Sequence, residues 1–175
     1  MQNLERQNII HRVLLGLLLA GVSTASVAQQ GDDSFKTYHV AGNVHMLEPA
    51  NTNGNVGVLS GEDDIPLIDD HFDFSVESLL RSIAAISNEE VRFVVNTHVH
   101  PDHMGGNNKL AAFGVTIIAH DTVRLQMLKD IRIPRRGGIF MDQPPAAARP
   151  ILTYTEAISF HVNGKEVRVF LSPPA

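Results

Sequence analysis

Hydrophobic and polar residues alternate along the first part of the chain in the manner of short β-strands. Three such segments, residues 35–42, 43–50 and 55–64, are separated by glycine and asparagine turn signals. A fourth segment, residues 65–70, is short and apolar and ends in two carboxylates. The pattern therefore predicts four strands in quick succession.

The period of the apolar residues then changes to that of a helix. Helical spacing relates Val76, Leu79, Leu80, Ile83 and Ile86, and Ser75 is a candidate N-cap. The β-branched run 91–97 is typical of a strand buried on both faces. A helix at about 106–113, a strand at 115–119 and a helix at about 122–130 are expected to follow. This alternation predicts an α/β fold in which neighbouring parallel strands are covered by helices.

The last part of the chain contains a break and then a hairpin signal. Residues 131–150 hold four of the nine prolines, which predicts a surface loop or flap. Two alternating segments, 157–162 and 165–171, flank Asn163 and Gly164. An Asn-Gly pair between alternating apolar residues is a strong signal for a β-hairpin.

The first 28 residues have the order of a secretory signal peptide. Arg6, His11 and Arg12 precede a ten-residue apolar run, and small residues follow up to Ala28, the expected cleavage site. Ten apolar residues are too few to span a bilayer, which requires about 20. We therefore expect a signal peptide at 1–28, a domain at 29–175, and a periplasmic or secreted protein without membrane attachment after cleavage. An uncleaved anchor or a buried helix of the domain is the alternative.

Composition and charge exclude several kinds of site and partner. The 175-residue chain has no cysteine, which excludes disulfides, cysteine-ligated zinc and a cysteine nucleophile. Removing residues 1–28 takes away two basic and one acidic residue, so 12 basic and 18 acidic residues remain. This negative balance does not suggest a nucleic-acid or anionic-membrane partner. Oligomeric state is not indicated by the sequence.

The segment 96–107, NTHVHPDHMGGN, concentrates groups that bind metals. His98, His100, Asp102 and His103 place three imidazoles and one carboxylate within six residues, a ligand set suited to zinc, iron or manganese. Four ligands this close together exceed what one tetrahedral ion can comfortably collect, so two ions are expected. The cluster follows a predicted buried strand, the end at which open α/β sheets place their ligands.

The local backbone also bears on how these side chains point. Pro101 biases His100 towards extended geometry. If the segment continued as an extended chain, His98, His100 and Asp102 would point to one side and His103 to the other.

This H-x-H-x-D-H motif, the "PLIDD" strand ending at Asp69 and the "GGN" after the motif resemble the metallo-β-lactamase-fold hydrolase superfamily over about residues 36–175. The resemblance implies an αββα sandwich, of which this chain holds the N-terminal half and the start of the second half. It also implies that His98 and His100 bind one metal ion, and that Asp102 and His103 bind another. Asp69 matches an aspartate that supports the motif and hydrogen-bonds a ligand imidazole, although an ordinary turn residue is an equal alternative.

The function implied by the resemblance is zinc-dependent hydrolysis. Two Zn²⁺ ions would supply a metal-bound hydroxide that attacks an ester, lactone, thioester, phosphodiester or β-lactam bond, because bound zinc lowers the pKa of water from 15.7 to about 7. Asp102 would be the catalytic residue that orients the hydroxide or handles a proton. The residues do not indicate which of these bonds is cleaved.

In this family, a further histidine for each metal ion lies well downstream of the motif, whereas the sequence stops at Ala175. We therefore expect an incomplete domain that binds zinc weakly and hydrolyses little by itself. Two alternatives stay open: a truncated, catalytically inactive metal-binding fragment, and an iron-dependent relative of the same fold.

Five other histidines are expected to have lesser roles. His39 and His45 alternate with apolar neighbours on predicted strands, which favours structural or surface positions. His71 is expected in a solvated loop, and His120 at a strand end is expected to face away from the metals. His161 precedes the hairpin turn and has no evident metal role.

Overall fold

A computed structural model describes residues 34–134 and 138–172. The predicted signal peptide and its cleavage after Ala28 lie outside these residues. Within them, the helices are all too short or too polar to cross a membrane.

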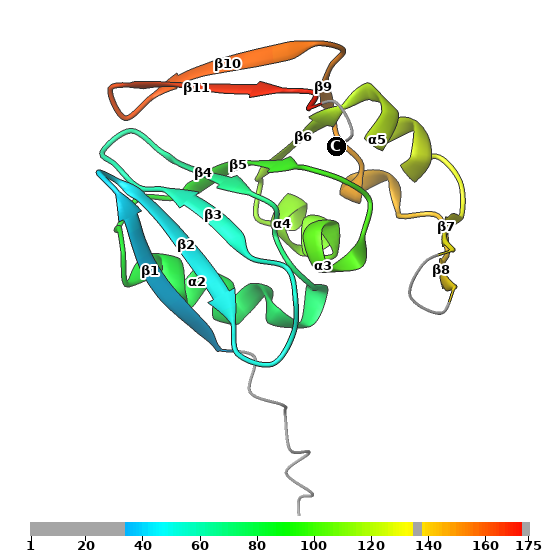
Figure 1. The fold of residues 1–175 in the computed structure, drawn as a ribbon, viewed down its shortest axis with the longest axis horizontal. Coiled ribbons are helices and arrows are strands. Elements are labelled where there is room, and N and C mark those ends of the chain that lie inside the picture. Colours follow the sequence, from blue (N-terminus) through cyan, green and yellow to red (C-terminus); the bar gives the residue numbers. More distant parts are fainter. Residues whose placement is uncertain (1–33, 135–137, 173–175) are drawn as a thin grey trace, which may run out of the picture. The chain divides into compact units, whose positions relative to one another are not determined.

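The described residues form a mixed α/β unit around one large sheet (Figure 1). Its strands follow the order β1-β2-β3-β4-β5-β6-β9. Their bounds are β1 Phe35–Ala41, β2 Val44–Pro49, β3 Val56–Leu59, β4 Ile65–Ile68, β5 Val91–Asn96, β6 Thr116–His120 and β9 Leu152–Tyr154. Strands β1 to β4 are antiparallel neighbours, whereas β4, β5, β6 and β9 run parallel. The predicted α/β class is confirmed, but β9 was not anticipated.

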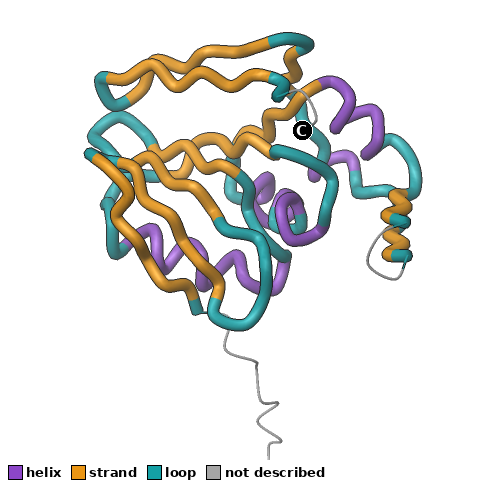
Figure 2. The backbone as a smooth tube through the Cα atoms, viewed as in Figure 1, coloured by secondary structure: helices purple, strands orange, loops and turns teal. Residues whose placement is uncertain are grey.

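The main apolar core lies between the sheet and two helices, α2 (Val76–Ala84) and α4 (Asn107–Ala112). Leu79 of α2 and Leu110 of α4 are fully buried in the same cluster as Val94 of β5. Figure 2 shows both helices on the same face of the sheet. The helical periodicity of the sequence therefore marks the side of α2 that faces the core.

The predicted N-cap of α2 is wrong in its chemistry. Ser75 occupies the N-cap position as the last residue of a short 3₁₀ turn, η1 (Asp73–Ser75), but its side chain makes no capping hydrogen bond. Its hydroxyl instead lies 2.8 Å from the carbonyl of Phe72 and 2.6 Å from Nδ1 of His71. A buried histidine therefore competes with the helix end for this hydroxyl group.

The predicted hairpin forms as β10 (Ala157–Val162) and β11 (Lys165–Phe170) and covers the other face of the sheet (Figure 1). The rings of Phe160 and Phe93 stack with their centroids 4.9 Å apart, which joins the hairpin to β5. The turn is positioned by Asn163, whose backbone N–H donates to Asp63 Oδ2 at 2.6 Å. Asn163 Nδ2 also donates to the carbonyl of Asp64 at 2.7 Å, and Asn163 Oδ1 accepts from Asp63 N–H at 2.9 Å.

Replacing Asn163 with alanine is therefore expected to lower the free energy of unfolding by about 1–3 kcal/mol. The change removes three side-chain hydrogen bonds, to Asp63, Asp64 and Leu59. It also places alanine at a φ of 54°, a conformation that asparagine tolerates better. Urea denaturation measures the effect. Asn163→Gly should recover part of the loss because glycine accepts this φ, and a variant as stable as the parent would contradict the anchoring role.

The segment 131–150 is not the plain loop that its prolines predicted. It contains a small hairpin, β7 (Ile131–Ile133) and β8 (Ile139–Met141), and a 3₁₀ turn, η2 (Ala146–Ala148). Ile131 and Ile133 alternate along β7 and are buried with Met127 of helix α5 (Asp121–Met127) in a second apolar cluster. The prolines flank these elements and do not interrupt them. The proline content therefore predicted a loop where tertiary contacts stabilise β7.

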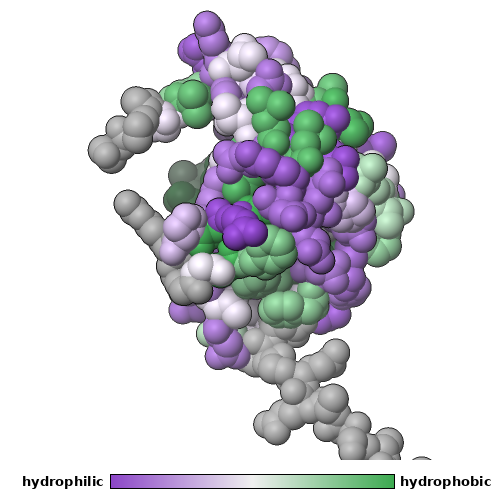
Figure 3. Space-filling model, turned by 90° about the vertical axis from the view of Figure 1, so that its right-hand side faces the viewer, coloured by the Kyte–Doolittle hydropathy of each residue, from purple (hydrophilic) through white to green (hydrophobic). Residues whose placement is uncertain are grey.

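Large apolar side chains also remain exposed in the described unit. Figure 3 shows apolar patches between hydrophilic side chains on one of its faces. The most exposed are Ile151, Phe113, Leu125, Phe170, Val40, Phe74 and Leu171. Exposed apolar surface of this kind favours association.

Candidate metal centre

The candidate ligands follow β5, where the carboxyl ends of β4 and β5 lie side by side. His98 lies at a bend in the connection after β5, whereas His100 is extended, with φ −73° and ψ 146°. Asp102 and His103 instead lie in a short helix, α3 (Pro101–Met104). The expected alternation of an extended chain is therefore wrong beyond His100. Proline at the first helical position has the φ that a helix requires, so Pro101 starts the helix here.

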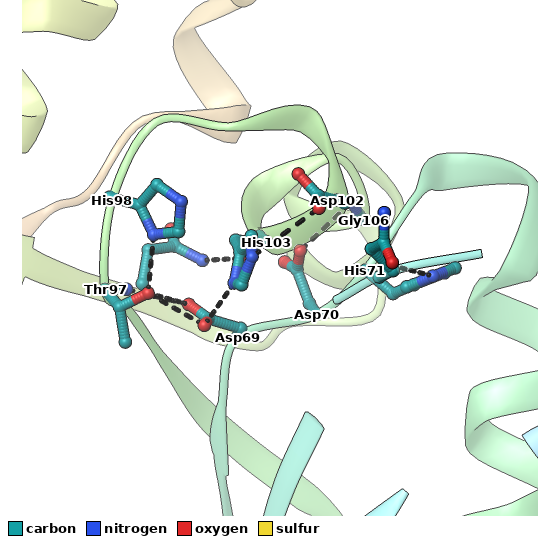
Figure 4. A network of polar contacts seen from close by, with 10 residues as sticks. Asp69, Asp70, His71, Thr97, His98, Asp102, His103 and Gly106 are labelled. Carbon is teal, nitrogen blue, oxygen red and sulfur yellow. Dashed lines mark hydrogen bonds and ion pairs between the residues drawn. The ribbon is translucent and has the colours of Figure 1, made fainter. Parts of the chain in front are cut away.

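The fold brings the four predicted ligands together, and Figure 4 shows three of them, His98, Asp102 and His103. The ring centroid of His98 lies 4.1 Å from that of His103 and 4.5 Å from that of His100. His103 Nε2 lies 3.6 Å from Asp102 Oδ2. In residues 34–134 and 138–172, however, no three or more His, Asp or Glu side chains already have the arrangement that holds a metal ion. The ligand assignment therefore stays a prediction.

Asp69 is the residue that orients His103. Its carboxylate is almost completely buried, and Oδ2 accepts a hydrogen bond from His103 Nδ1 at 2.7 Å. Thr97 donates to the same carboxylate through its backbone N–H at 2.7 Å and its hydroxyl at 2.8 Å. A hydrogen bond at Nδ1 fixes the ring tautomer and makes Nε2 the atom that can bind a metal ion.

The neighbouring Asp70 was not anticipated as part of this site. It is fully buried, and Oδ1 accepts a hydrogen bond from the backbone N–H of Gly106 at 3.1 Å. Oδ2 has no hydrogen-bond partner among the described residues. Burial raises the pKa of Asp70 well above its ordinary value, and the nearby Asp69 raises this pKa further. Protonation of this carboxyl group is therefore easier than that of an exposed aspartate.

Two asparagines, Asn96 and Asn107, support the motif through hydrogen bonds. Asn107 belongs to the quoted GGN, but the sequence assigned no role to either residue. Asn107 Nδ2 donates to Asn96 Oδ1 at 2.8 Å and to the carbonyl of Ala148 at 2.9 Å. Asn96 Nδ2 in turn donates to the carbonyl of His103 at 3.2 Å. Both residues lie at the ends of the segment 96–107, so they were visible in the sequence. Their hydrogen-bond partners could not be predicted from it.

His71 contradicts the expectation of a solvated loop residue, because only 1% of it is exposed. Burial lowers its pKa, so the neutral ring is favoured. His120 also has a structural role: Nδ1 accepts from the N–H of Thr122 at 3.1 Å, and Nε2 donates to the carbonyl of Thr155 at 2.7 Å. His120 thus caps α5 and does not join the candidate ligands.

The chemistry of the donor set fits a zinc ion. Burial lowers the pKa of His98, and the neighbouring rings of His103 and His100 lower this pKa further. Neutral imidazole is the form that binds metal ions, and it combines with the carboxylate of Asp102 in a ligand set that suits zinc.

Comparison with known proteins identifies the family. Residues 51–170 match the model of the metallo-beta-lactamase superfamily. The chain belongs to this superfamily. No curated protein sequence matches the chain.

Solved metallo-β-lactamases share the fold of this superfamily member. A metallo-beta-lactamase from Pontibacter korlensis is 18% identical with a TM-score of 0.62, and the similarity covers 78% of this chain and 60% of that one. A metallo-β-lactamase from Cronobacter sakazakii, described by its HARLDQ motif, is 22% identical with a TM-score of 0.61, covering 76% and 51% of the two chains. The chain thus spans between half and three fifths of the length of these two proteins.

Proposed function

We propose that this superfamily member is part of a zinc-dependent hydrolase that binds two metal ions and cleaves an ester, lactone, thioester or β-lactam bond of a small molecule. The observation that carries the proposal is the cluster of three imidazole rings and Asp102 at the end of β5, in which Asp69 orients one of the rings. The superfamily match supports the hydrolase class. A substrate assay would determine which of these bonds is cleaved.

The four proposed ligands of this chain would bind two metal ions, two ligands to each ion. His98 and His100 would hold one ion, and Asp102 and His103 the other. Bound zinc supplies water of lowered pKa and polarises the bond to be cleaved. Asp102 would accept or return a proton at its carboxylate, which lies beside His103 Nε2. Asp69 would keep Nε2 of His103 turned towards the metal through its hydrogen bond at Nδ1.

The 175-residue polypeptide by itself is expected to bind zinc weakly and to hydrolyse little. Within this polypeptide each ion would have two of the proposed ligands, whereas three or more protein ligands are usual. The alternative function is metal binding without catalysis by this polypeptide. An iron-dependent activity is the other alternative that this donor set allows.

Metal content and hydrolysis test the proposal together. The purified chain is dialysed against zinc, and its bound metal is measured by mass spectrometry beside the hydrolysis of a chromogenic β-lactam and a nitrophenyl ester. His98→Ala with His100→Ala should reduce zinc affinity at least about 100-fold, because both proposed ligands of one ion are lost. His161→Ala, at an exposed histidine, is the control. Equal loss in the control, or zinc binding unchanged by the double substitution, would reject the assignment.

We also propose that the protein acts in the periplasm or outside the cell, on the basis of the signal-peptide pattern in residues 1–28. Expression of the full sequence in a bacterial host should yield a periplasmic product with a new N-terminus after Ala28. A product that keeps Met1 and stays in the cytoplasm would contradict this location.

A further inference from the structure

The loop between β2 and β3, residues 50–55, is in contact with the metal motif. A Cβ atom placed on Gly54 would lie 2.0 Å from the carbonyl oxygen of Asp102, so the two backbones touch with no side chain between them. Gly54 also has a φ of 96°, which a residue with a side chain rarely adopts. The position of this loop and the position of Asp102 therefore depend on each other.

His71 fastens this loop to the sheet. Its Nε2 lies 3.0 Å from the carbonyl of Asn53 and 2.8 Å from the hydroxyl of Thr52. On the other side of the ring, Nδ1 lies 2.6 Å from the hydroxyl of Ser75, just before α2. Because a carbonyl only accepts, Nε2 carries the hydrogen in its bond to Asn53. Nδ1 lies within hydrogen-bond distance of the Ser75 hydroxyl, which donates to the carbonyl of Phe72.

The surroundings of His71 leave little freedom to the ring. It makes edge-on contacts with Phe35 and Phe72, with ring centroids 5.3 Å and 4.8 Å away. Its backbone has a φ of 62°, which is uncommon for a residue with a side chain. An apolar side chain could fill this space but could not join α2 to the loop, because only the two ring nitrogens make those hydrogen bonds.

We propose that His71 is a positioning residue, which holds residues 52–54 against the backbone of Asp102 and so shapes the wall beside the metal motif. Figure 4 shows His71 beyond Asp70, on the far side of the polar network from His98. His71 therefore acts through the loop and not as a metal ligand. Its effect on the metal site rests on the proposed function, whereas its hold on the loop does not.

Hydrogen exchange of the metal-free, full-length chain tests the hold on the loop. His71→Asn tolerates the positive φ and can still reach Ser75, but it is too short to reach the loop. We expect it to speed exchange of the amides at 51–55 about tenfold, the change expected from the loss of ordinary hydrogen bonds, with α2 and β5 unaffected. His71→Gln, which is long enough to reach Asn53, should restore exchange to within about threefold of the parent.

Two results would overturn the hold on the loop: unchanged exchange at 51–55 in His71→Asn, or an equal increase in every element, which indicates general destabilisation. Thr52→Val is a second test in which misfolding is not expected, because this side chain is exposed. It should speed exchange in the loop alone, by about threefold. No change in Thr52→Val would contradict the role of the hydroxyl.

Zinc titration tests the consequence for the metal motif. His71→Asn is expected to lower zinc affinity about tenfold, the lower end of the range for residues that orient metal ligands. A loosened loop with unchanged zinc affinity would overturn the positioning role while leaving the proposed function intact. If the parent chain binds no zinc at all, the proposed function fails, and the exchange result still decides whether His71 holds the loop.

Discussion

Replacing Asp69 with alanine is expected to weaken zinc binding by about 10- to 100-fold and to lower the free energy of unfolding by about 2–4 kcal/mol. The carboxylate accepts from Thr97 and from His103 at distances of 2.7–3.0 Å, and it is almost completely buried. Its removal leaves these donors without their acceptor and lets the ring of His103 turn. Isothermal titration with zinc and urea denaturation measure the two effects.

The asparagine variant separates charge from shape at the same position. Asp69→Asn preserves the size of the side chain and tolerates the φ of 63° at this position. It presents one oxygen where aspartate presents two, so either Thr97 or His103 loses its acceptor, and an intermediate loss of affinity is expected. Asp73→Asn, at a carboxylate that is more than half exposed, is the control and should leave zinc binding unchanged. If Asp69→Ala binds zinc as tightly as Asp73→Asn, Asp69 does not orient a ligand.

Replacing Gly106 with alanine is the second change with a large expected effect. A Cβ atom at this position would lie 2.7 Å from the carbonyl oxygen of Asp70 and 2.9 Å from Cγ2 of Val76. Gly106 is buried, and its N–H donates to both the side chain of Asp70 and the carbonyl of His71. A shift of the backbone to make room for the methyl group would therefore break these hydrogen bonds. A loss of about 2–3 kcal/mol in the free energy of unfolding is expected, as for other overpacked sites.

Gly114→Ala is the matched comparison for Gly106→Ala. Gly106 has an ordinary helical φ of −77° but no space for a methyl group, whereas Gly114 has open space but a φ of 85°. The Gly114 variant should lose only about 1–2 kcal/mol, the cost of a left-handed conformation for alanine. Thermal denaturation of both variants compares the two effects. A Gly106 variant as stable as the parent would contradict the lack of space at this position, because its backbone conformation costs alanine nothing.

Much of the candidate site could be predicted from the sequence because its signals are local. The strand β5, the four candidate ligands and the glycines that follow occupy one continuous segment, residues 91–106. The succession of strands along the chain up to β6 also follows from alternation and turn residues that lie close together in the sequence. The helix α3 is the exception within this segment, since Pro101 favours an extended residue before it and also begins a helix well.

The sequence by itself therefore determined the α/β class and the segment that carries the candidate ligands, because hydrophobic periodicity and motif spacing act over a few residues. The tertiary structure alone decided the roles of Asp70 and His71 and the pairing of β9 with β6. His71 reaches a loop 18 residues earlier in the chain, and Asp70 accepts from Gly106, 36 residues later. Contacts over such separations depend on how the strands are ordered in the sheet, and no local pattern of residues specifies that order.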